Sequence, residues 1–352
     1  MDITQDINET LDAPVLNWLD MRKDYPEPQY LLRYNGVGFA PLGDIQVMRA
    51  EAKNGKTFTF TILMAAVLSG DNLGFTCEHE NPTVLYIDTE QHENNTALVG
   101  RRVHSMCGWD LHENFEQFRI LTLRGQNPDK CRKAVLEAIE LVNPVAVFVD
   151  GIADLVNDPN DYKESADLVR EFMDIAAKRN ISIFTVLHVN PGSEKMRGHL
   201  GSEMMRKVSD VFNSTKKKTA DGVYFEVEQV MARNRDIDKF TFTIDDSKLG
   251  VPQRPSVSEM AALDADEKMK ALWQDKPTYN YSGMREALME KFQVKDRKAR
   301  EIIKNAINAG IILKHENGKY SYTGLEFAKK LKEQDENRQV NPLGEEKEDA
   351  PF

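Results

Sequence analysis

Residues 44–57 constrain the possible folds of this chain more than any other segment. The apolar run Asp44-Ile-Gln-Val-Met48 is followed by Ala50-Glu-Ala-Lys-Asn-Gly55-Lys56-Thr57 and then by a second apolar run. This order predicts a strand, a tight loop and a helix, the context in which Gly-Lys-Thr forms a phosphate-binding loop. Gly55 allows close backbone approach, Lys56 supplies a cation for the phosphates, and the Thr57 hydroxyl can ligate Mg²⁺ beside a helix N-terminus. The alternative is a helix start that merely contains Gly-Lys-Thr, and Ala50 stands where this pattern usually has glycine.

Composition favours a soluble globular protein with one large domain and one small domain. The chain has 352 residues, of which 41% are hydrophobic and 29% charged. No apolar stretch reaches transmembrane length and the first residues lack a signal-peptide pattern, so we expect a cytoplasmic protein without membrane contact. The scattered cysteines, Cys77, Cys107 and Cys131, predict reduced thiols. The net charge of −11 alone argues against a nucleic-acid partner, but charge distribution matters more than the sum.

Alternation of apolar runs and helical patterns predicts an α/β domain over residues 29–255, preceded by a polar arm over residues 1–28. Strands separated by helices predict a mostly parallel sheet, and the last three strands look like an antiparallel extension. The expected strands are Ile45–Arg49, Thr83–Asp88, Phe118–Leu123, Ala146–Asp150, Ile181–Leu187, Val211–Thr215, Tyr224–Val230 and Phe240–Ile244. The expected helices are Thr57–Leu68, Thr96–Cys107, Asp129–Val142 and Tyr162–Arg179.

Acidic residues follow two of these strands where a phosphate-binding loop would need them. Asp150 ends an apolar strand, which places its carboxylate at the edge of the sheet that holds the loop, and we expect it to support Mg²⁺. Glu90 follows another strand and is the candidate base or water-orienting residue, with Asp88 as a possible buttress. The alternatives are that Asp150 only starts a turn and that Glu90 is a solvated loop acid.

Polar residues after two later strands predict further functional groups. His188 ends the strand Ile181–Leu187 and could bond a terminal phosphate, although a lone histidine is often structural. Lys195 and Arg197 lie in the following Gly-containing segment, which we expect to be a loop that grips a DNA backbone or is simply solvated. Arg233 and Arg235 could reach a neighbouring subunit's nucleotide, or could be ordinary surface arginines.

Taken in order, these motifs resemble those of the RecA-like ATPases. The similarity covers roughly residues 30–250 and is strongest to hexameric plasmid helicases of the RepA type, in the DnaB- and KaiC-related AAA_25 group. The resemblance implies a RecA-like P-loop NTPase core that binds ATP and Mg²⁺ and hydrolyses ATP. It implies that Glu90 activates water, that His188 couples nucleotide to DNA, and that Arg233 and Arg235 act across a subunit interface. The expected nucleotide contacts are Asn54, Gly55, Lys56, Thr57 and Phe58, with Thr57 and Asp150 at the metal.

The C-terminal part predicts a second, smaller unit. A boundary near residue 255 precedes a helical linker over residues 256–275, and residues 276–332 carry a net charge of 13 − 6 = +7. Helices Met284–Phe292 and Asp296–Ala309 followed by a hairpin with an Asn-Gly turn resemble a winged helix, an α+β fold. The candidate DNA-binding residues in this unit are Arg297, Lys298, Arg300 and Lys304, although a winged helix can also serve protein contact.

Residues 333–352 form an acidic tail with a net charge of 2 − 7 = −5. Its end, Asp349-Ala-Pro351-Phe352, resembles the tip of bacterial single-stranded DNA-binding proteins, which docks on replication and repair proteins. Pro351 and Phe352 would then bind a host replication or repair protein, unless the tail is only a disordered solubilising segment.

The sequence thus predicts a DNA-dependent Mg-ATPase that forms a homo-oligomer, with a hexamer expected. It would act as a ring helicase or translocase in replication, mobilisation or maintenance of a plasmid or other mobile element. One rival is a DNA-binding regulator switched by ATP. The other is an adaptor or loader that recruits host proteins through its C-terminal tip.

Overall fold

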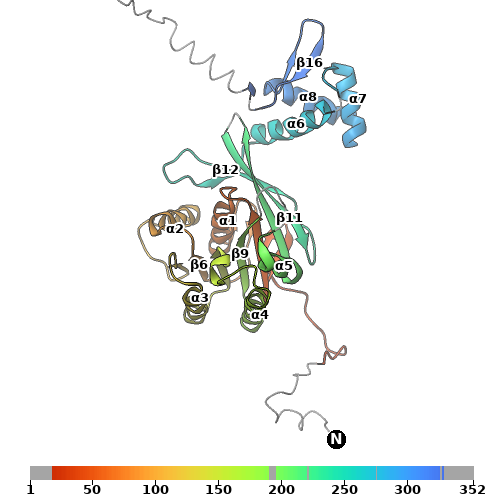
Figure 1. The fold of residues 1–352 in the computed structure, drawn as a ribbon. Coiled ribbons are helices and arrows are strands. Elements are labelled where there is room, and N and C mark those ends of the chain that lie inside the picture. The colour runs from red at the N-terminus through yellow and green to blue at the C-terminus, as the bar shows by residue number, and fades with distance from the viewer. Residues whose placement is uncertain (1–17, 190–195, 220–221, 275, 326, 329–352) are drawn as a thin grey trace, which may run out of the picture.

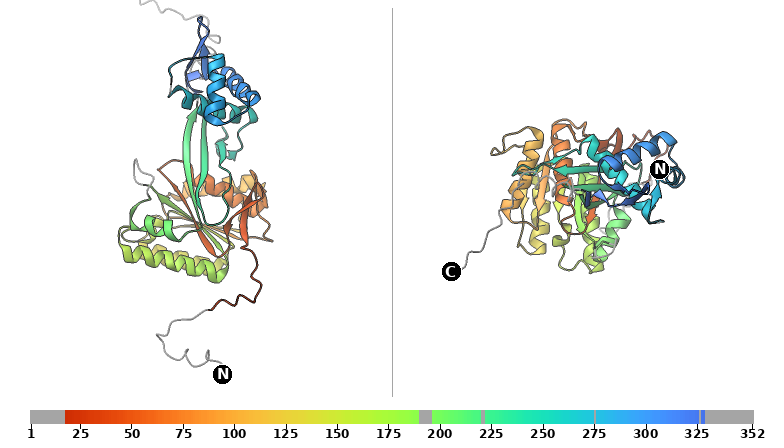
Figure 2. Two further views of the ribbon diagram at one scale, coloured as in Figure 1. Left: turned by 90° about the vertical axis from the view of Figure 1, so that its right-hand side faces the viewer. Right: turned by 90° about the horizontal axis from the view of Figure 1, so that it is seen from above.

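A computed structural model describes residues 18–189, 196–219, 222–274, 276–325 and 327–328. A large α/β body lies at one end of the molecule and a small unit of helices and a hairpin lies at the other, joined by a long two-stranded ribbon (Figures 1 and 2). Among the described residues, no helix combines the length and the apolar character needed to cross a bilayer.

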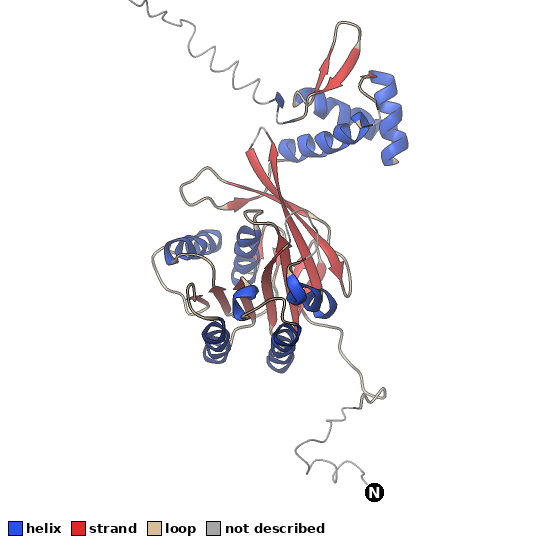
Figure 3. Cartoon of the chain, viewed as in Figure 1, coloured by secondary structure: helices blue, strands red, loops and turns tan. Residues whose placement is uncertain are grey.

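A nine-stranded sheet forms the centre of the large body (Figure 3). Its order is β13-β12-β11-β10-β3-β9-β8-β6-β7. Neighbouring strands from β10 to β7 are parallel, and those from β10 to β13 are antiparallel. The strands are β3 (Asp44–Ala50), β6 (Val84–Asp88), β7 (Phe118–Thr122), β8 (Ala146–Asp150), β9 (Ser182–His188), β10 (Asp210–Thr219), β11 (Gly222–Ala232), β12 (Phe240–Ile244) and β13 (Pro252–Gln253).

The predicted mostly parallel α/β core is confirmed, with one correction to the antiparallel extension. We expected the strand at 211–215 to belong to that extension, but β10 pairs in parallel with β3. The antiparallel part therefore begins at β11, which follows β10 in the chain and pairs antiparallel with it.

Helices cover both faces of this sheet, which gives three layers and two apolar cores. One core holds α1 (Lys56–Ser69) and α2 (Glu93–Cys107). The other holds α3 (Pro128–Val142), the short helix η1 (Ile152–Leu155), α4 (Tyr162–Arg179) and α5 (Gly198–Lys207). Strand side chains alternate between the two cores, as in β6, where Tyr86 faces the first and Ile87 the second. Coverage of both faces explains why the central strands are apolar throughout.

A second, four-stranded sheet packs beside α1 and was not predicted. Its order is β2-β1-β5-β4, and Leu31, Phe39 and Phe75 from it join the first core. The strands are β1 (Tyr30–Tyr34), β2 (Val37–Pro41), β4 (Asp71–Asn72) and β5 (Phe75–Thr76). Two of them are only two residues long, so they carry no alternating pattern that sequence could reveal.

The C-terminal unit has its own apolar core and the expected order of helices and hairpin. It comprises α6 (Val257–Trp273), β14 (Tyr279–Asn280), α7 (Tyr281–Phe292), α8 (Asp296–Asn308), β15 (Ile312–Lys314) and β16 (Lys319–Tyr322). We expected α6 to be a linker, but Ala265, Met269 and Leu272 lie in this core. The first helix of the pair begins at Tyr281 rather than Met284, because the Asn280 side chain accepts a hydrogen bond from Gly283 N and caps it.

Candidate functional site

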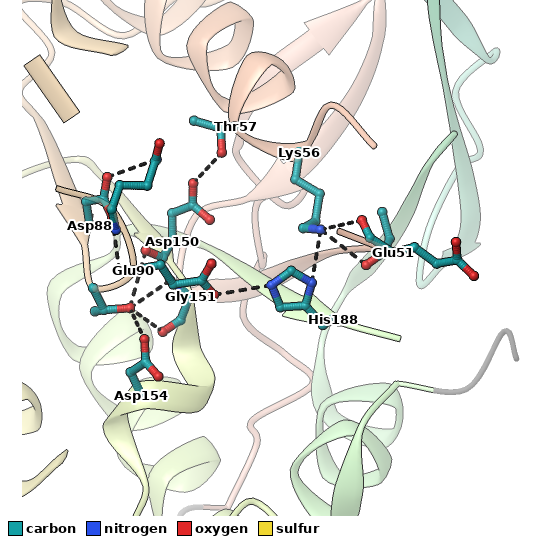
Figure 4. A network of polar contacts seen from close by, with 12 residues as sticks. Glu51, Lys56, Thr57, Asp88, Glu90, Asp150, Gly151, Asp154 and His188 are labelled. Atoms are coloured by element: carbon teal, nitrogen blue, oxygen red, sulfur yellow. Dashed lines mark hydrogen bonds and ion pairs between the residues drawn. The ribbon is translucent and has the colours of Figure 1, made fainter. Parts of the chain in front are cut away.

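The phosphate-binding loop lies between β3 and α1, at the carboxyl edge of the parallel strands (Figure 4). Gly55 precedes the first residue of α1 with a φ of +85°. A Cβ atom at this position would lie 2.3 Å from the Phe225 ring, so both the backbone angle and the space require glycine. Ala50 is the last residue of β3 and is absent from the described residues with positive φ, so alanine is compatible with the backbone there.

Lys56 is held inside the loop by three acceptors. Its Nζ donates to Ala50 O at 3.2 Å and Glu51 O at 2.8 Å, and lies 3.2 Å from His188 Nδ1. The side chain is buried, and burial lowers the pKa of its ammonium group, while the nearby carboxylates of Asp150 and Glu90 act in the opposite direction. The ammonium group is therefore desolvated by burial and bonded to uncharged acceptors, a state suited to an incoming anion.

Thr57 and Asp150 are brought together as a pair. The Thr57 hydroxyl donates to Asp150 Oδ2 at 2.7 Å. Burial raises the pKa of Asp150 from 3.8 to about 6, although the Thr57 hydrogen bond partly offsets this effect. A hydroxyl and a buried carboxylate are hard oxygen donors of the kind that Mg²⁺ prefers, so these residues fit the ion that the motif implies.

Glu90 and His188 form a second pair, next to Asp150 and Lys56. His188 Nε2 lies 3.3 Å from Glu90 Oε1, and hydrogen bonding to His188 is the largest cause that lowers the pKa of Glu90. With Nδ1 accepting from Lys56 and Nε2–H donating to Glu90, one neutral imidazole tautomer satisfies both contacts. Figure 4 shows the imidazole of His188 between these two side chains.

Asp88 holds the neighbouring turn and does not point toward the loop lysine. It accepts from Glu90 N at 3.1 Å, Gln91 N at 2.9 Å and Thr96 Oγ1 at 2.8 Å. Its acceptor positions are therefore used locally, and its contacts are those of a buttress. The hydroxyl of buried Tyr86 lies 3.3 Å from Asp88 and 3.4 Å from Asp150, and joins the two strand ends.

One cavity of about 520 Å³ is lined by the phosphate-binding loop together with Glu90, Asp150 and His188, and by further residues that the motifs did not predict. Phe58, an expected nucleotide contact, lies between the Arg102 guanidinium, 4.7 Å from its ring centroid, and the Phe225 ring at 5.8 Å. Lys216 also lines the cavity, and its backbone N donates to Asn54 Oδ1 at 3.2 Å. Arg102, Lys216 and Phe225 come from α2, β10 and β11, and no local pattern marks them, because only the fold brings them to the loop.

Comparison with known proteins gives the family. Residues 11–194, more than half of the chain, match the AAA_25 family model, described as an AAA domain. The chain belongs to the AAA_25 family. It is therefore a P-loop ATPase, and its core is of the predicted RecA-like type.

Other comparisons add little to this assignment. A KaiC-like protein from the hyperthermophilic archaeon Pyrococcus horikoshii OT3 is similar in structure, with 16% sequence identity and a TM-score of 0.44. The similarity covers 61% of this chain and 92% of that one. None of the curated proteins compared with this chain matches it.

In this AAA_25 ATPase, Arg233 and Arg235 lie away from the chain's own cavity. Arg233 donates to Lys207 O at 2.9 Å and lies 3.7 Å from Asp44, the first residue of β3. Because the phosphate-binding loop follows the last residue of β3, these arginines lie at the opposite edge of the sheet. Both are exposed.

The segment after His188 is only partly the loop that we expected. Lys195 lies outside the described residues, whereas the backbone N of Arg197 donates to His188 O at 3.0 Å. Residues from Gly198 onward form α5 instead of a loop, because Leu200 and Met204 supply an apolar face that packs into the second core.

The basic residues expected on α8 differ in their surroundings. Arg300 pairs with Asp296 at 2.9 Å and Lys298 with Glu301 at 2.8 Å. Within the described part of the chain, no ion pair involves Arg297 or Lys304, and both are exposed. Pro351 and Phe352 lie outside the described residues.

Proposed function

We propose that this chain is a DNA-dependent Mg-ATPase that works as a homo-oligomeric ring, with six subunits expected. The observation that carries the hydrolytic part is the convergence of Lys56, Thr57, Asp150 and Glu90 on one cavity of about 520 Å³. These residues come from α1 and from the ends of neighbouring parallel strands, which is where open α/β folds bind ligands.

Each residue has a distinct role in the proposed reaction. Lys56 would exchange its carbonyl acceptors for phosphate oxygens, and Thr57 and Asp150 would hold Mg²⁺. The ion, when bound, offsets phosphate charge and keeps Asp150 ionised despite its burial. Glu90, kept ionised by its hydrogen bond to His188, orients a water molecule toward the terminal phosphate.

The position of Arg233 and Arg235 supports an oligomer. Because Arg233 lies at the sheet edge opposite the cavity, a nucleotide that it or the nearby Arg235 served would have to be bound to another subunit. In related phosphoryl transfers, an arginine supplied by a neighbouring subunit raises the rate by a factor of about 10³–10⁵. Repeating this head-to-tail contact generates a ring when its rotation closes.

Two features support DNA as the effector. His188 touches both Lys56 and Glu90 and is bonded through its backbone to Arg197, at the start of the segment that leads to α5. A DNA contact near Arg197 would therefore act directly on the catalytic pair. Exposed Arg297 and Lys304 on α8 offer a second phosphate-binding surface.

The resemblance to RepA-type helicases extends the proposal to a helicase or translocase for a plasmid or other mobile element. An ATP-switched DNA-binding regulator is the second candidate. It is favoured by the separate core of the C-terminal unit, which could bind duplex DNA without a motor. An adaptor acting through Pro351 and Phe352 remains a hypothesis on the sequence alone.

ATP turnover tests the proposal. We expect wild-type turnover to be stimulated by single-stranded DNA and Glu90→Gln to abolish turnover while nucleotide still binds. Tight ATP binding without DNA-stimulated turnover would favour the switched regulator instead.

A mixing experiment tests action in trans. Glu90→Gln and Arg235→Ala should each be inactive, but random mixed rings place an intact Glu90 opposite an intact Arg235 at about one quarter of the interfaces. We therefore expect partial recovery on mixing, and no recovery if Arg235 acts elsewhere.

A further inference from the structure

Thr89 stands between Asp88 and Glu90, directly after the last residue of β6. It is buried, at 5% exposed, and is not among the described residues that line the nucleotide cavity. A buried polar side chain needs hydrogen-bond partners, and the partners of Thr89 show which part of the site it holds.

Thr89 bonds the turn that follows β8 through both its backbone and its side chain. Its backbone N donates to Asp150 O at 2.9 Å. Its hydroxyl oxygen accepts from Gly151 N at 3.0 Å and lies 2.7 Å from Asp154 Oδ2. The same oxygen lies 2.9 Å from Gly151 O and 3.3 Å from Asp150 O, but a hydroxyl has a single proton to donate. The carboxylate of Asp154 is the nearest of these acceptors and the one that carries charge, so it takes the proton.

These bonds matter because Gly151 abuts the carboxylate of Glu90. A Cβ atom on Gly151 would lie 2.5 Å from Glu90 Oε1, so the backbone there limits where this carboxylate can lie. The same oxygen lies 3.3 Å from His188 Nε2 (Figure 4). Glu90 Oε1 is therefore in contact with His188 and close to Gly151, and Gly151 in turn is bonded to Thr89.

We propose that Thr89 is a positioning residue for the carboxylate of Glu90. Asp154 takes the hydroxyl proton of Thr89 and so turns a lone pair of the oxygen toward Gly151 N–H. The bonded Gly151 backbone then keeps the Glu90 carboxylate where it can orient water. The inference rests on the proposed hydrolysis of ATP and adds a residue that acts on it only through Glu90.

A threonine that merely stabilises the sheet is the alternative, and Thr185 on β9 offers the matched control. Thr185 is fully buried, and its hydroxyl donates to Gln46 O of β3 at 3.1 Å. It is not among the described residues that line the nucleotide cavity. Thr185→Val therefore removes a buried hydroxyl from the same sheet without changing the turn after β8.

Steady-state ATPase kinetics and binding of a non-hydrolysable ATP analogue test the proposal. Thr89→Val keeps the shape of the side chain but leaves the buried Gly151 N–H without its acceptor. We expect kcat to fall by about 10- to 100-fold, since a shift of about 1 Å in a reacting group can cost that much. The KM for ATP and the affinity for the analogue should stay within about 3-fold, because the loss is confined to the transition state.

Two conservative variants separate positioning from other roles. Thr89→Ser retains the hydroxyl and should keep kcat within about 3-fold of the wild type. Asp154→Asn retains an oxygen that accepts the hydroxyl proton, so it should also keep kcat within about 3-fold. A fall in Asp154→Asn as large as that in Thr89→Val would overturn the proposal by showing that the charge of Asp154 acts on the reaction.

The remaining outcomes decide between positioning and stability alone. Thr185→Val should lower the thermal midpoint and leave kcat nearly unchanged. If Thr89→Val behaves in the same way, or if Thr89→Ser loses as much activity as Thr89→Val, the positioning role is wrong while the proposed hydrolysis stands. A wild type that hydrolyses no ATP, with or without DNA, would refute the hydrolysis and the positioning role together.

Discussion

Gly151→Ala should impair catalysis by moving Glu90. The φ of Gly151 is −127°, a backbone angle that alanine adopts without strain. A Cβ atom at this position, however, would lie 2.5 Å from Glu90 Oε1 and 3.3 Å from Glu90 Cδ. Ordinary contact begins at 3.4 Å, so the carboxylate must retreat by 3.4 − 2.5 = 0.9 Å or more.

The expected cost follows from this displacement. A misplacement of about 1 Å in a reacting group can cost about 10²-fold in rate, so we expect kcat to fall by about 10- to 100-fold. Stability should change little, because the atom that yields is the end of a flexible side chain and the next nearest residue, at Val186 O, lies 3.7 Å away. The ATPase rate and the thermal midpoint, measured on the same preparation, check both statements.

A double-mutant comparison isolates the cause. In a Glu90→Gln background, Gly151→Ala should leave any residual turnover almost unchanged, because the group that it displaces has already lost its function. An unchanged kcat in the Gly151→Ala variant would refute the reasoning. So would a fall in kcat on Gly151→Ala that is the same in the wild type and in the Glu90→Gln background.

Two further predictions concern stability and DNA. In the absence of Mg²⁺ and at pH 7 or above, Asp150→Asn should raise the free energy of unfolding by up to about 3 kcal/mol. This figure follows from the rise in the pKa of Asp150 from 3.8 to about 6, at about 1.4 kcal/mol per pKa unit. Because the native state binds the proton more tightly, wild-type stability contributed by this group falls as pH rises from about 4 to 6. The gain should therefore shrink as pH is lowered through that range, and denaturant unfolding at pH 4, 6 and 8 measures it; a gain equal at all three values would contradict the assignment to burial. On α8, Arg297→Ala and Lys304→Ala should each weaken DNA binding and reduce the salt dependence of log K by about one unit, whereas Lys298→Ala should have less effect because Lys298 pairs with Glu301. Binding titrations at several salt concentrations check this, and equal effects of the three changes would show that the ion pair does not matter.

The core of the fold could be predicted because its signals are local. Gly55-Lys56-Thr57 lies within one loop, and Asp150 and His188 each end an apolar strand, so parallel strands must bring them to one edge. The pairing of Thr57 with Asp150 at 2.7 Å follows from that geometry. The role of each residue nevertheless stays a prediction until activity is measured.

Other parts depend on contacts between distant segments, which a sequence pattern does not contain. Phe225 packs on Gly55 from 170 residues away, and nothing near either residue indicates the contact. The expected loop after His188 became α5 from Gly198 onward because its apolar residues match the second core, a match that depends on where α4 lies. The short strands β4 and β5 are set by their neighbours rather than by their own residues.

The contact of Phe225 with Gly55 also connects the nucleotide loop to the C-terminal unit. Phe225 lies on β11 directly opposite Lys216 of β10, whose backbone bonds Asn54 in the loop. One residue further along β11, Glu226 pairs with Lys239 at 3.2 Å, and Lys239 lies 3.7 Å from Glu267 of α6. The ribbon of β10 and β11 therefore touches the phosphate-binding loop near its middle and reaches the C-terminal unit through this ion-pair chain. The Phe225 ring lies so close to Gly55 that a single added methyl group would overlap it, so a nucleotide that moves Gly55 toward the ring would shift Phe225. Movement of the loop would then reach α6 through packed strands, which gives the proposed motor a direct route from ATP to the C-terminal unit.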